Sequence, residues 1–256
     1  MKKQITPLQI FSGIISLLGL ALSILSRSAA ISKDASSGSV LLFALSLITF
    51  VAGIAMFVAS LHPRHPVNVR TLTLAAMFAA LCYIGFAFLR IDIPVGTEKT
   101  AFHLGNVFCV LAALFLGGMW GGMSGAIGLT IADLTSGYVT SAPKTFFLKL
   151  GIGLIAGFVA HRLFQLSRDK ERKVPLPVAT VLSCGAGMLF NMIADPLVGY
   201  FYKTWILGVP QDAAAIWANI GALTTSVNAV IAVIAATVLY LALRPALKHS
   251  DLLPQI

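Results

Sequence analysis

The sequence predicts an all-α integral membrane protein, and three observations support this fold class. Of the 256 residues, 58% are hydrophobic and only 11% are charged, whereas a soluble protein of this size would need more charge to cover its surface. The apolar residues gather in runs close to the roughly 20 residues that a helix needs to cross a bilayer. The basic residues that give the net charge of +9 lie between these runs and form no patch, so orientation in a membrane explains them better than nucleic-acid binding.

The first quarter of the chain predicts a separate membrane unit. Leu8–Ser26 and Ser39–Leu61 are apolar runs long enough to span a bilayer. The basic start before Leu8 also allows a signal-peptide interpretation, but the run is long for the apolar core of such a peptide. The segment His62–Pro66 then interrupts the chain, because neither of its prolines continues a helix. We therefore expect two domains, a two-helix N-terminal membrane extension over residues 1–66 and a six-helix core over residues 67–256.

Six further apolar segments complete a prediction of eight spans. They are Thr71–Leu89, Ala101–Leu116, Gly118–Ser136, Thr145–Phe164, Leu176–Tyr202 and Ala213–Leu243. An even number of spans puts both termini on the same side of the membrane. Lys and Arg are concentrated in the loops of one side, above all in Ser167–Val174 (SRDKERKV), and this bias places both termini in the cytoplasm.

Polar side chains inside the core spans gather at one depth. With the termini inside and a rise of about 1.5 Å per residue, they fall in the outer third of the bundle, while the inner halves hold no acidic or basic side chain between their ends. The residues at this depth are Arg90, Asn106, Asp133, Lys144, Lys149, Asn191, Asp195 and Asn219. Asn191 and Asp195 are one helical turn apart and therefore share a face.

The acidic residue Asp133 has two interpretations. An unpaired charge in hydrocarbon costs at least about 2.5–3.5 kcal/mol, so such a residue normally faces a partner or a cavity. Asp133 either forms a buried ion pair with a nearby basic residue or lines a polar pocket that opens outward. We favour the pocket, because several polar residues at one depth suit a ligand better than a single pair does. For Asn191, Asn219 and Asn228 taken singly, an ordinary interhelical hydrogen bond is an equally good interpretation.

Small residues recur at helical spacing in two of the spans. Gly117, Gly121 and Gly125 leave one face of the Gly118–Ser136 span almost without side chains, which permits close approach of a neighbouring helix. Ala75 and Ala79, together with Ala76 and Ala80, form a second small-residue stripe. Such a stripe is either an internal packing seam or a docking surface for another membrane protein, and the spacing alone leaves both open.

No motif for catalysis or for an energy source is found. The run Gly96–Thr100 (GTEKT) lacks the first glycine of a phosphate-binding loop, since Ile91 occupies that place. No nucleophile elbow, zinc-protease motif or carboxylate pair at catalytic spacing occurs. The three cysteines, each alone in an apolar run, predict small buried side chains rather than a metal site or a disulfide: Cys82, Cys109 and Cys184. We expect a binding protein that is not an enzyme and needs no cofactor.

The run Arg90–Lys149 contains R-I-D-I-P, F-H-L-G-N, A-L-F-L-G-G, G-A-I-G-L-T-I-A-D-L and S-A-P-K-T. These motifs resemble the substrate-specific S components of energy-coupling-factor (ECF) vitamin transporters, in particular the group with pantothenate, hydroxymethylpyrimidine and riboflavin type members. The resemblance covers about Arg70–Lys248. It implies a subunit of the prokaryotic plasma membrane that captures a vitamin or vitamin precursor outside for ATP-driven uptake. The partners that it implies are a transmembrane coupling protein and two cytoplasmic ATPases.

The resemblance also implies roles for individual residues. The positions that correspond to pocket-lining places are Asn106 of L-G-N, Asp133 of A-D-L, Tyr138 and Lys144. The loop Asp92–Thr100 corresponds to a lid. Ala75 and Ala79 match the A-x-x-x-A pattern by which the first core helix of the family meets the coupling protein. The two spans before residue 67 depart from the six-helix pattern of the family, and their role stays open.

Two other functions are compatible with a helical membrane protein. A self-sufficient secondary carrier or channel for a small polar solute predicts a continuous polar line through the inner half, and the sequence shows none. A structural membrane protein with an ion-paired core predicts that Asp133 contacts a lysine with no cavity around it. If a vitamin binds, Arg90, Lys144 and Lys149 favour a substrate with a carboxylate or phosphate, and hence pantothenate over hydroxymethylpyrimidine.

Overall fold

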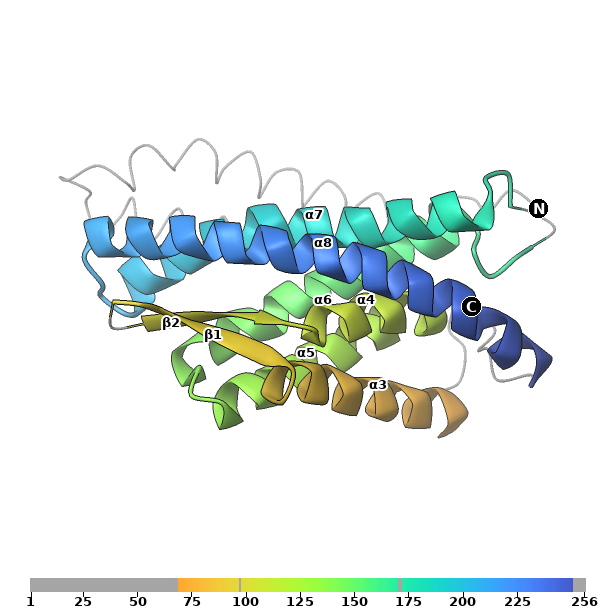
Figure 1. The fold of residues 1–256 in the computed structure, drawn as a ribbon, viewed down its shortest axis with the longest axis horizontal. Helices are drawn as coiled ribbons and strands as arrows, with labels where there is room; N and C mark the ends of the chain where they lie inside the picture. Colours follow the sequence, from red (N-terminus) through yellow and green to blue (C-terminus); the bar gives the residue numbers. More distant parts are fainter. Residues whose placement is uncertain (1–68, 97, 170–171, 251–256) are drawn as a thin grey trace, which may run out of the picture. The chain divides into compact units, whose positions relative to one another are not determined.

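The computed structural model describes residues 69–96, 98–169 and 172–250. The chain divides into two compact units, Met1–Pro66 and Val67–Ile256, and the two predicted N-terminal spans lie outside the described residues. In the second unit the described elements are six α-helices and one β-hairpin (Figure 1). In chain order they are α3 (Val69–Ala87), β1 (Arg90–Val95), β2 (Glu98–His103), α4 (Gly105–Leu116), α5 (Gly118–Thr135), α6 (Ala142–Phe158), α7 (Leu176–Phe201) and α8 (Gln211–His249). Short helical turns join them: η1 (Val139–Ser141), η2 (Val159–Leu163) and η3 (Tyr202–Ile206).

The β-hairpin shows that the predicted span Ala101–Leu116 begins too early. Residues 101–103 belong to β2 rather than to a helix, and β2 pairs antiparallel with β1 from Arg90↔His103 to Val95↔Glu98. Gly96, at the turn, has a φ of 63°, a conformation that glycine adopts without strain and that tight hairpin turns require. The start of the β1 sequence, R-I-D-I, alternates polar and apolar residues as strands do, and this alternation indicates a strand at this place in the sequence.

The short helix α4 occupies the centre of the bundle. Eleven of its twelve residues are buried, the exception being Phe108, and it contacts α3, α5, α6 and α8. A helix surrounded on all sides is expected to be apolar on all sides, which explains why the sequence of α4 shows no polar face. At twelve residues it is shorter than a bilayer is thick.

The glycines of α5 allow close backbone contact with its neighbours, among them α4 and α6. A Cβ atom added to Gly153 of α6 would overlap the Cα of Gly122, and one added to Gly157 would overlap the backbone of Gly118. We call this α5–α6 contact, made by Gly118, Gly122, Gly153 and Gly157, the glycine seam. On the other side of α5, a Cβ at Gly121 would overlap the backbone of α4. The predicted close approach is therefore confirmed, with two neighbouring helices rather than one.

One side of the alanine stripe of α3 is an internal seam. Ala75 is only 7% exposed, and Ser124 of α5 donates a hydrogen bond to its carbonyl oxygen (2.9 Å). The carbonyl of Ala79 occupies the place where a Cβ on Gly128 would lie. The part of the stripe around Ala75 thus packs against α5 inside the unit, while Ala79 is partly exposed. The exposed alanines of α3 are Ala76 and Ala80.

Four of the described helical segments are long and apolar enough to cross a membrane. They are Val69–Ala87, Val139–Leu163, Leu176–Ile206 and Gln211–His249. Helix α4 is apolar but shorter. Of the six spans predicted in the part of the chain that the structure describes, four therefore meet this criterion of length and composition, and the full number of eight stays a prediction.

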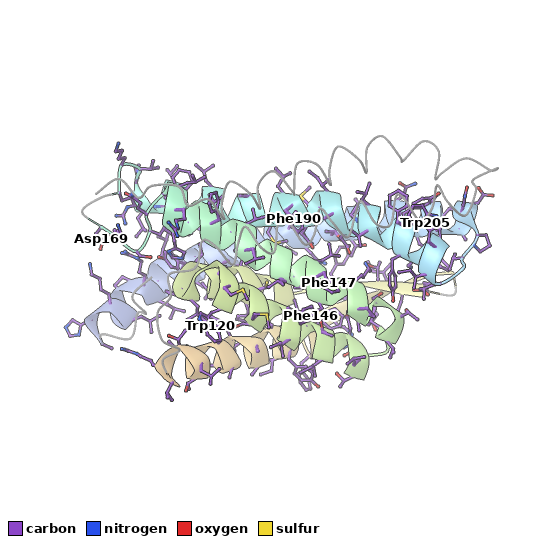
Figure 2. The ribbon with its side chains drawn as sticks, turned by 180° about the vertical axis from the view of Figure 1, so that it is seen from behind. Trp120, Phe146, Phe147, Asp169, Phe190 and Trp205 are labelled. Carbon is purple, nitrogen blue, oxygen red and sulfur yellow. The ribbon has the colours of Figure 1, made fainter. Side chains whose placement is uncertain are left out.

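An ion-pair cluster ties α8 to the loop before α7. Asp169 accepts hydrogen bonds from Lys248 (2.5 Å), Arg172 (2.7 Å) and Arg244 (2.9 Å). The bond from Lys248, followed by those from Arg172 and Arg244, holds the pKa of the Asp169 carboxyl well below its usual range. Figure 2 shows Asp169 and Trp205 near opposite ends of the described structure. The cluster fixes α8 at the end remote from Trp205.

Candidate functional site

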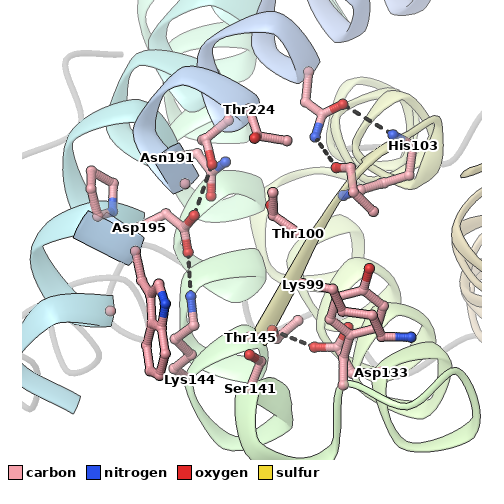
Figure 3. Close-up of a pocket in the computed structure, with 18 of the residues that line it drawn as sticks. Lys99, Thr100, His103, Asp133, Ser141, Lys144, Thr145, Asn191, Asp195 and Thr224 are labelled. Carbon is pink, nitrogen blue, oxygen red and sulfur yellow. Dashed lines mark hydrogen bonds and ion pairs between the residues drawn. The ribbon is translucent and has the colours of Figure 1, made fainter. Parts of the chain in front are cut away.

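A polar cavity of ≈ 140 Å³ lies where the hairpin meets the helices (Figure 3). Its walls come mainly from α4, α5, α6, α7, α8 and strand β2, with single residues from α3, β1, η1 and η3. Six of the eight predicted site residues line it: Asn106, Asp133, Tyr138, Lys144, Asn191 and Asp195. This common location agrees with the argument from depth, while their role as ligand contacts stays a prediction.

Two predicted site residues lie elsewhere. Arg90 braces the base of the hairpin, where it pairs with Asp92 (2.9 Å) and donates to Ser136 (3.0 Å). Asn219 is exposed on α8, because α8 turns Trp217 and Gly221 toward the cavity and a residue two positions from Gly221 points to the other side of a helix. The sequence thus predicted how far along its helix each residue lies, but not to which side of the helix the side chain of Asn219 points.

One ion pair crosses the cavity wall and joins three helices. Lys144 of α6 donates to Oδ1 of Asp195 of α7 at 2.7 Å, and Thr225 of α8 donates to Oδ2 of the same carboxylate at 2.8 Å. The side chains of Lys144 and Asp195 are 14% and 21% exposed. Pro143 lies in the first turn of α6, where its missing N–H leaves no helical hydrogen bond unmade, and Lys144 directly after it lies at the level of Asp195.

Asp133 and Lys149 line the cavity without an ion pair. Asp133 accepts a hydrogen bond from Thr145 (2.6 Å), and Lys149 donates a long one to Asn191 (3.4 Å). Both residues are buried, at 4% and 8% exposure. Among the described residues neither contacts an oppositely charged side chain. The interpretation of Asp133 as half of a buried ion pair with Lys144, Lys149 or Arg90 therefore finds no such contact in the described structure. Of these candidates, Lys144 pairs with Asp195.

Asn106, in the first turn of α4, carries an unsatisfied polar atom. The residue is 1% exposed, and its Oδ1 has no hydrogen-bond partner in the described structure. Buried side-chain oxygens in proteins normally accept a hydrogen bond. Since Asn106 lines the cavity, a donor group of a bound molecule or a water would complete it.

The hairpin covers the cavity and is held at both ends. At its tip, Lys203 of η3 pairs with Glu98 (3.3 Å) and lies over the ring of Trp217 (4.3 Å). At its base, Asn228 of α8 binds the free edge of β2 by two hydrogen bonds. Its Oδ1 accepts from the His103 amide (3.0 Å) and its Nδ2 donates to the Ala101 carbonyl (2.9 Å). The side-chain amide thus replaces the peptide group of a third strand.

Replacing Asn228 with leucine is expected to speed amide exchange at His103 at least tenfold, since that N–H loses its acceptor. Hydrogen–deuterium exchange with mass spectrometry on a peptide covering residues 98–104 measures this. Asn219→Leu on the exposed side of the same helix is the matched control and should leave the exchange unchanged. Equal exchange in both variants would show that Asn228 does not hold the strand.

The His103 imidazole is kept neutral. Gly105 donates its backbone N–H to Nδ1 (3.1 Å), so the proton of the neutral ring resides on Nε2. Burial, followed by the positive charge of Lys149, lowers the pKa of His103 to about 3, against a smaller opposite effect of Asp195. The imidazole is therefore uncharged at neutral pH.

Stability is expected to fall as the pH drops below about 6.5, the pKa of histidine in an unfolded chain. Below that pH the histidine of the unfolded chain binds a proton, whereas His103 in the folded chain stays neutral because its pKa is about 3. Protonation therefore favours the unfolded state. Thermal unfolding in detergent at pH 7 and pH 5 measures the effect. His103→Gln should reduce the difference in melting temperature between the two pH values, and an unchanged difference would contradict the assignment.

Several residues that line the cavity were not predicted as site residues from the sequence. Lys149 was counted among the basic residues at this depth but was not assigned to the binding site, and for Asn228 an interhelical hydrogen bond was as good an interpretation as a ligand contact. His103 stands inside the F-H-L-G-N motif, which was a usable signal. Nothing in the local sequence marks Trp217 or Thr225, because their place in the wall depends on how α8 packs against α7.

The comparison with protein families gives one match. A family model described as ECF-type riboflavin transporter, S component, matches residues 66–245, well over half of the chain and all of the cavity. Neither a curated protein nor a solved structure matches the chain.

Proposed function

Since the chain belongs to the family of ECF-type riboflavin transporter S components, we propose that it captures a vitamin or vitamin precursor outside the cell for ATP-driven uptake. Membership of this family makes the chain a multi-pass transport protein of the cell membrane. It is a substrate-binding subunit rather than an enzyme. The proposal adds the direction of capture, the site and the partners.

The observation that carries the proposal is the polar cavity in an apolar bundle. Asn106, Asp133 and Lys149 are all at least nine-tenths buried, all line the cavity, and have unused hydrogen-bonding or charged capacity. Buried polar groups in membrane proteins are costly and mark binding sites or ion paths by default. The hairpin over the cavity supports enclosure of the ligand.

The proposed partners are a transmembrane coupling protein and two cytoplasmic ATPases. No phosphate-binding motif is present in this sequence, so the energy for release must come from other subunits. The exposed face of α3 around Ala76 and Ala80 is the proposed contact for the coupling protein, because small side chains let helices approach closely. This is the exposed side of the predicted alanine stripe, whose residue Ala75 is buried against α5.

Riboflavin is the first ligand to test. The matching family is described by that vitamin, and the cavity is lined by aromatic side chains that suit a ring system, including Phe86, Tyr138 and Trp217. The preference for pantothenate drawn from the sequence counted Lys144 as an available cation, and Lys144 pairs with Asp195.

The proposal is tested by binding and by uptake. Riboflavin should bind to the purified chain in detergent, and Asp133→Ala should weaken binding at least tenfold, about 1.4 kcal/mol, while Asn219→Ala does not. In cells, uptake should require a co-expressed ECF coupling protein with its two ATPases. Uptake by this chain alone under ATP depletion would support the self-sufficient carrier instead.

A further inference from the structure

A second strongly charged region lies where α8 ends beside the loop before α7, away from the cavity. Asp169 of that loop accepts hydrogen bonds from Arg172, Arg244 and Lys248. Figure 2 shows Asp169 near the end of the described structure remote from Trp205. Three positive charges thus share one carboxylate, so the ion pairs leave this end of the bundle with an excess of positive charge.

Two further basic residues of the same loop add to this excess. Arg168 and Lys173 lie on either side of the ion-paired segment, and both side chains are exposed. The two residues at 170 and 171 are one lysine and one glutamate, which contribute no net charge. We call the five basic residues of the described chain that gather around Asp169 the basic cluster: Arg168, Arg172, Lys173, Arg244 and Lys248.

Exposed apolar side chains stand beside the basic cluster on each segment that meets there. Leu163 ends η2, Val178 lies in the first turn of α7, and Leu243 is the last exposed large apolar residue of α8. From Leu243 to Lys248 the helix rises about 7.5 Å, close to the roughly 5–7 Å thickness of the headgroup layer on one side of a bilayer. With Leu243 at the edge of the hydrocarbon, Lys248 lies at the depth of the lipid headgroups.

The chemistry of this arrangement matches a lipid with a negative headgroup. Lys and Arg bind phosphate groups through their charge and their N–H donors. The Lys and Arg bias of the sequence predicts that this end is cytoplasmic, and the cytoplasmic leaflet carries anionic lipids that attract basic segments next to membrane spans. One such lipid contacts the basic cluster with its headgroup and the apolar side chains with its acyl chains. An acidic surface of a partner protein has no use for the apolar side chains.

We propose that the basic cluster binds the phosphate headgroup of an anionic phospholipid of the cytoplasmic leaflet. Arg168, Lys173 and Lys248 supply exposed positive charge to the phosphate, and Asp169 holds the end of α8 against the loop. The acyl chains lie along Leu163 and Leu243. The bound lipid joins the loop before α7 to α8, and this site is separate from the cavity and independent of the ligand that the cavity takes.

The test is a competition assay on the full-length chain, immobilised in a nonionic detergent and loaded with radiolabelled dioleoyl phosphatidylglycerol. Unlabelled phosphatidylglycerol should displace the label at a concentration at least tenfold lower than dioleoyl phosphatidylcholine, which has the same acyl chains and a headgroup without net charge. Equal displacement by the two lipids would overturn the inference.

A double variant tests whether the basic cluster is the place of binding. Arg168→Gln with Lys173→Gln keeps Asp169 and its three donors, and should lower the affinity for phosphatidylglycerol at least fivefold. The matched control is Lys2→Gln with Lys3→Gln, which removes the same charge from the same predicted side of the membrane and should leave the affinity unchanged. An equal loss in both double variants would show that overall charge attracts the lipid, and would overturn the inference.

The single variant Lys248→Gln gives a second measurement if the double variant does not fold. It removes one exposed charge and leaves Asp169 with Arg172 and Arg244. Its affinity for phosphatidylglycerol should fall at least threefold, and an unchanged affinity would contradict the proposed part of Lys248.

Two further arms separate the lipid from other anions. Inorganic phosphate should displace the label only at concentrations at least 100-fold above those of phosphatidylglycerol, and displacement at equal concentration would make the basic cluster a site for free phosphate. The double variant should also be recovered with a co-expressed ECF coupling protein and its ATPases as well as the parent is. A double variant that binds the lipid normally but loses these subunits would assign the basic cluster to a protein partner and overturn the inference.

Discussion

Replacing Gly153 with alanine is expected to lower the free energy of unfolding by about 3 kcal/mol, at the upper end of what overpacking in a core costs. The added Cβ would overlap the Cα of Gly122 in the glycine seam. A backbone atom cannot turn aside as a flexible side chain does, so α5 and α6 must separate along their length. Unfolding in mixed micelles by titration with dodecyl sulfate measures the change.

Gly185→Ala is the matched control for this prediction. Gly185 also lies within a long helix, α7, but a Cβ there meets no atom within 4 Å. Alanine is favoured over glycine in a helix by roughly 0.5–1 kcal/mol, so this variant should be as stable as the parent or more so. Similar effects at Gly153 and Gly185 would show that the seam is looser than described.

Replacing Asp195 with leucine is expected to cost about 3–5 kcal/mol, because it leaves Lys144 charged and unpaired in a mostly buried site. The same change should abolish ligand binding, since Asp195 holds α6 and α8 together at the cavity through Lys144 and Thr225. The free energy of unfolding is measured in the same micelles, and binding is measured with riboflavin.

A double variant separates the ion pair from other effects of the substitution. Lys144→Met combined with Asp195→Leu removes both charges, and most of the lost stability should return, as is found when buried pairs are replaced by apolar side chains. The coupling between the two sites is read from the double-mutant cycle. Purely additive losses would contradict the assignment of the pair as the cause.

The sequence predicted the positions of the helices and the depth of the polar residues. Apolar length and the prolines determined where helices such as α6 begin, and these are local properties. The rise per residue then placed Asn106, Asp133 and Asn191 at one level, and all three line the cavity. Rotation about a helix axis depends on packing partners, so Asn219 was placed on the wrong side.

The pairing of charges could not be derived from the sequence either. Asp133 had several basic residues within reach at the same depth, and no local signal distinguishes them. The structure instead pairs Lys144 with a carboxylate 51 positions along the chain. The hairpin was missed for a related reason: β2 is held by Asn228, 125 positions away from His103, while its own sequence reads as the start of an apolar span.

The glycine seam has a consequence for how proteins of this architecture diverge. Where two backbones touch, no side chain can be enlarged, so the relative positions of α5 and α6 are closed to gradual change by substitution. Ligand preference can then be altered most readily on the opposite wall. Gly221 of α8 lines the cavity, and a Cβ there meets no atom within 4 Å. A larger side chain in place of Gly221 would narrow the cavity for a smaller ligand without moving any helix.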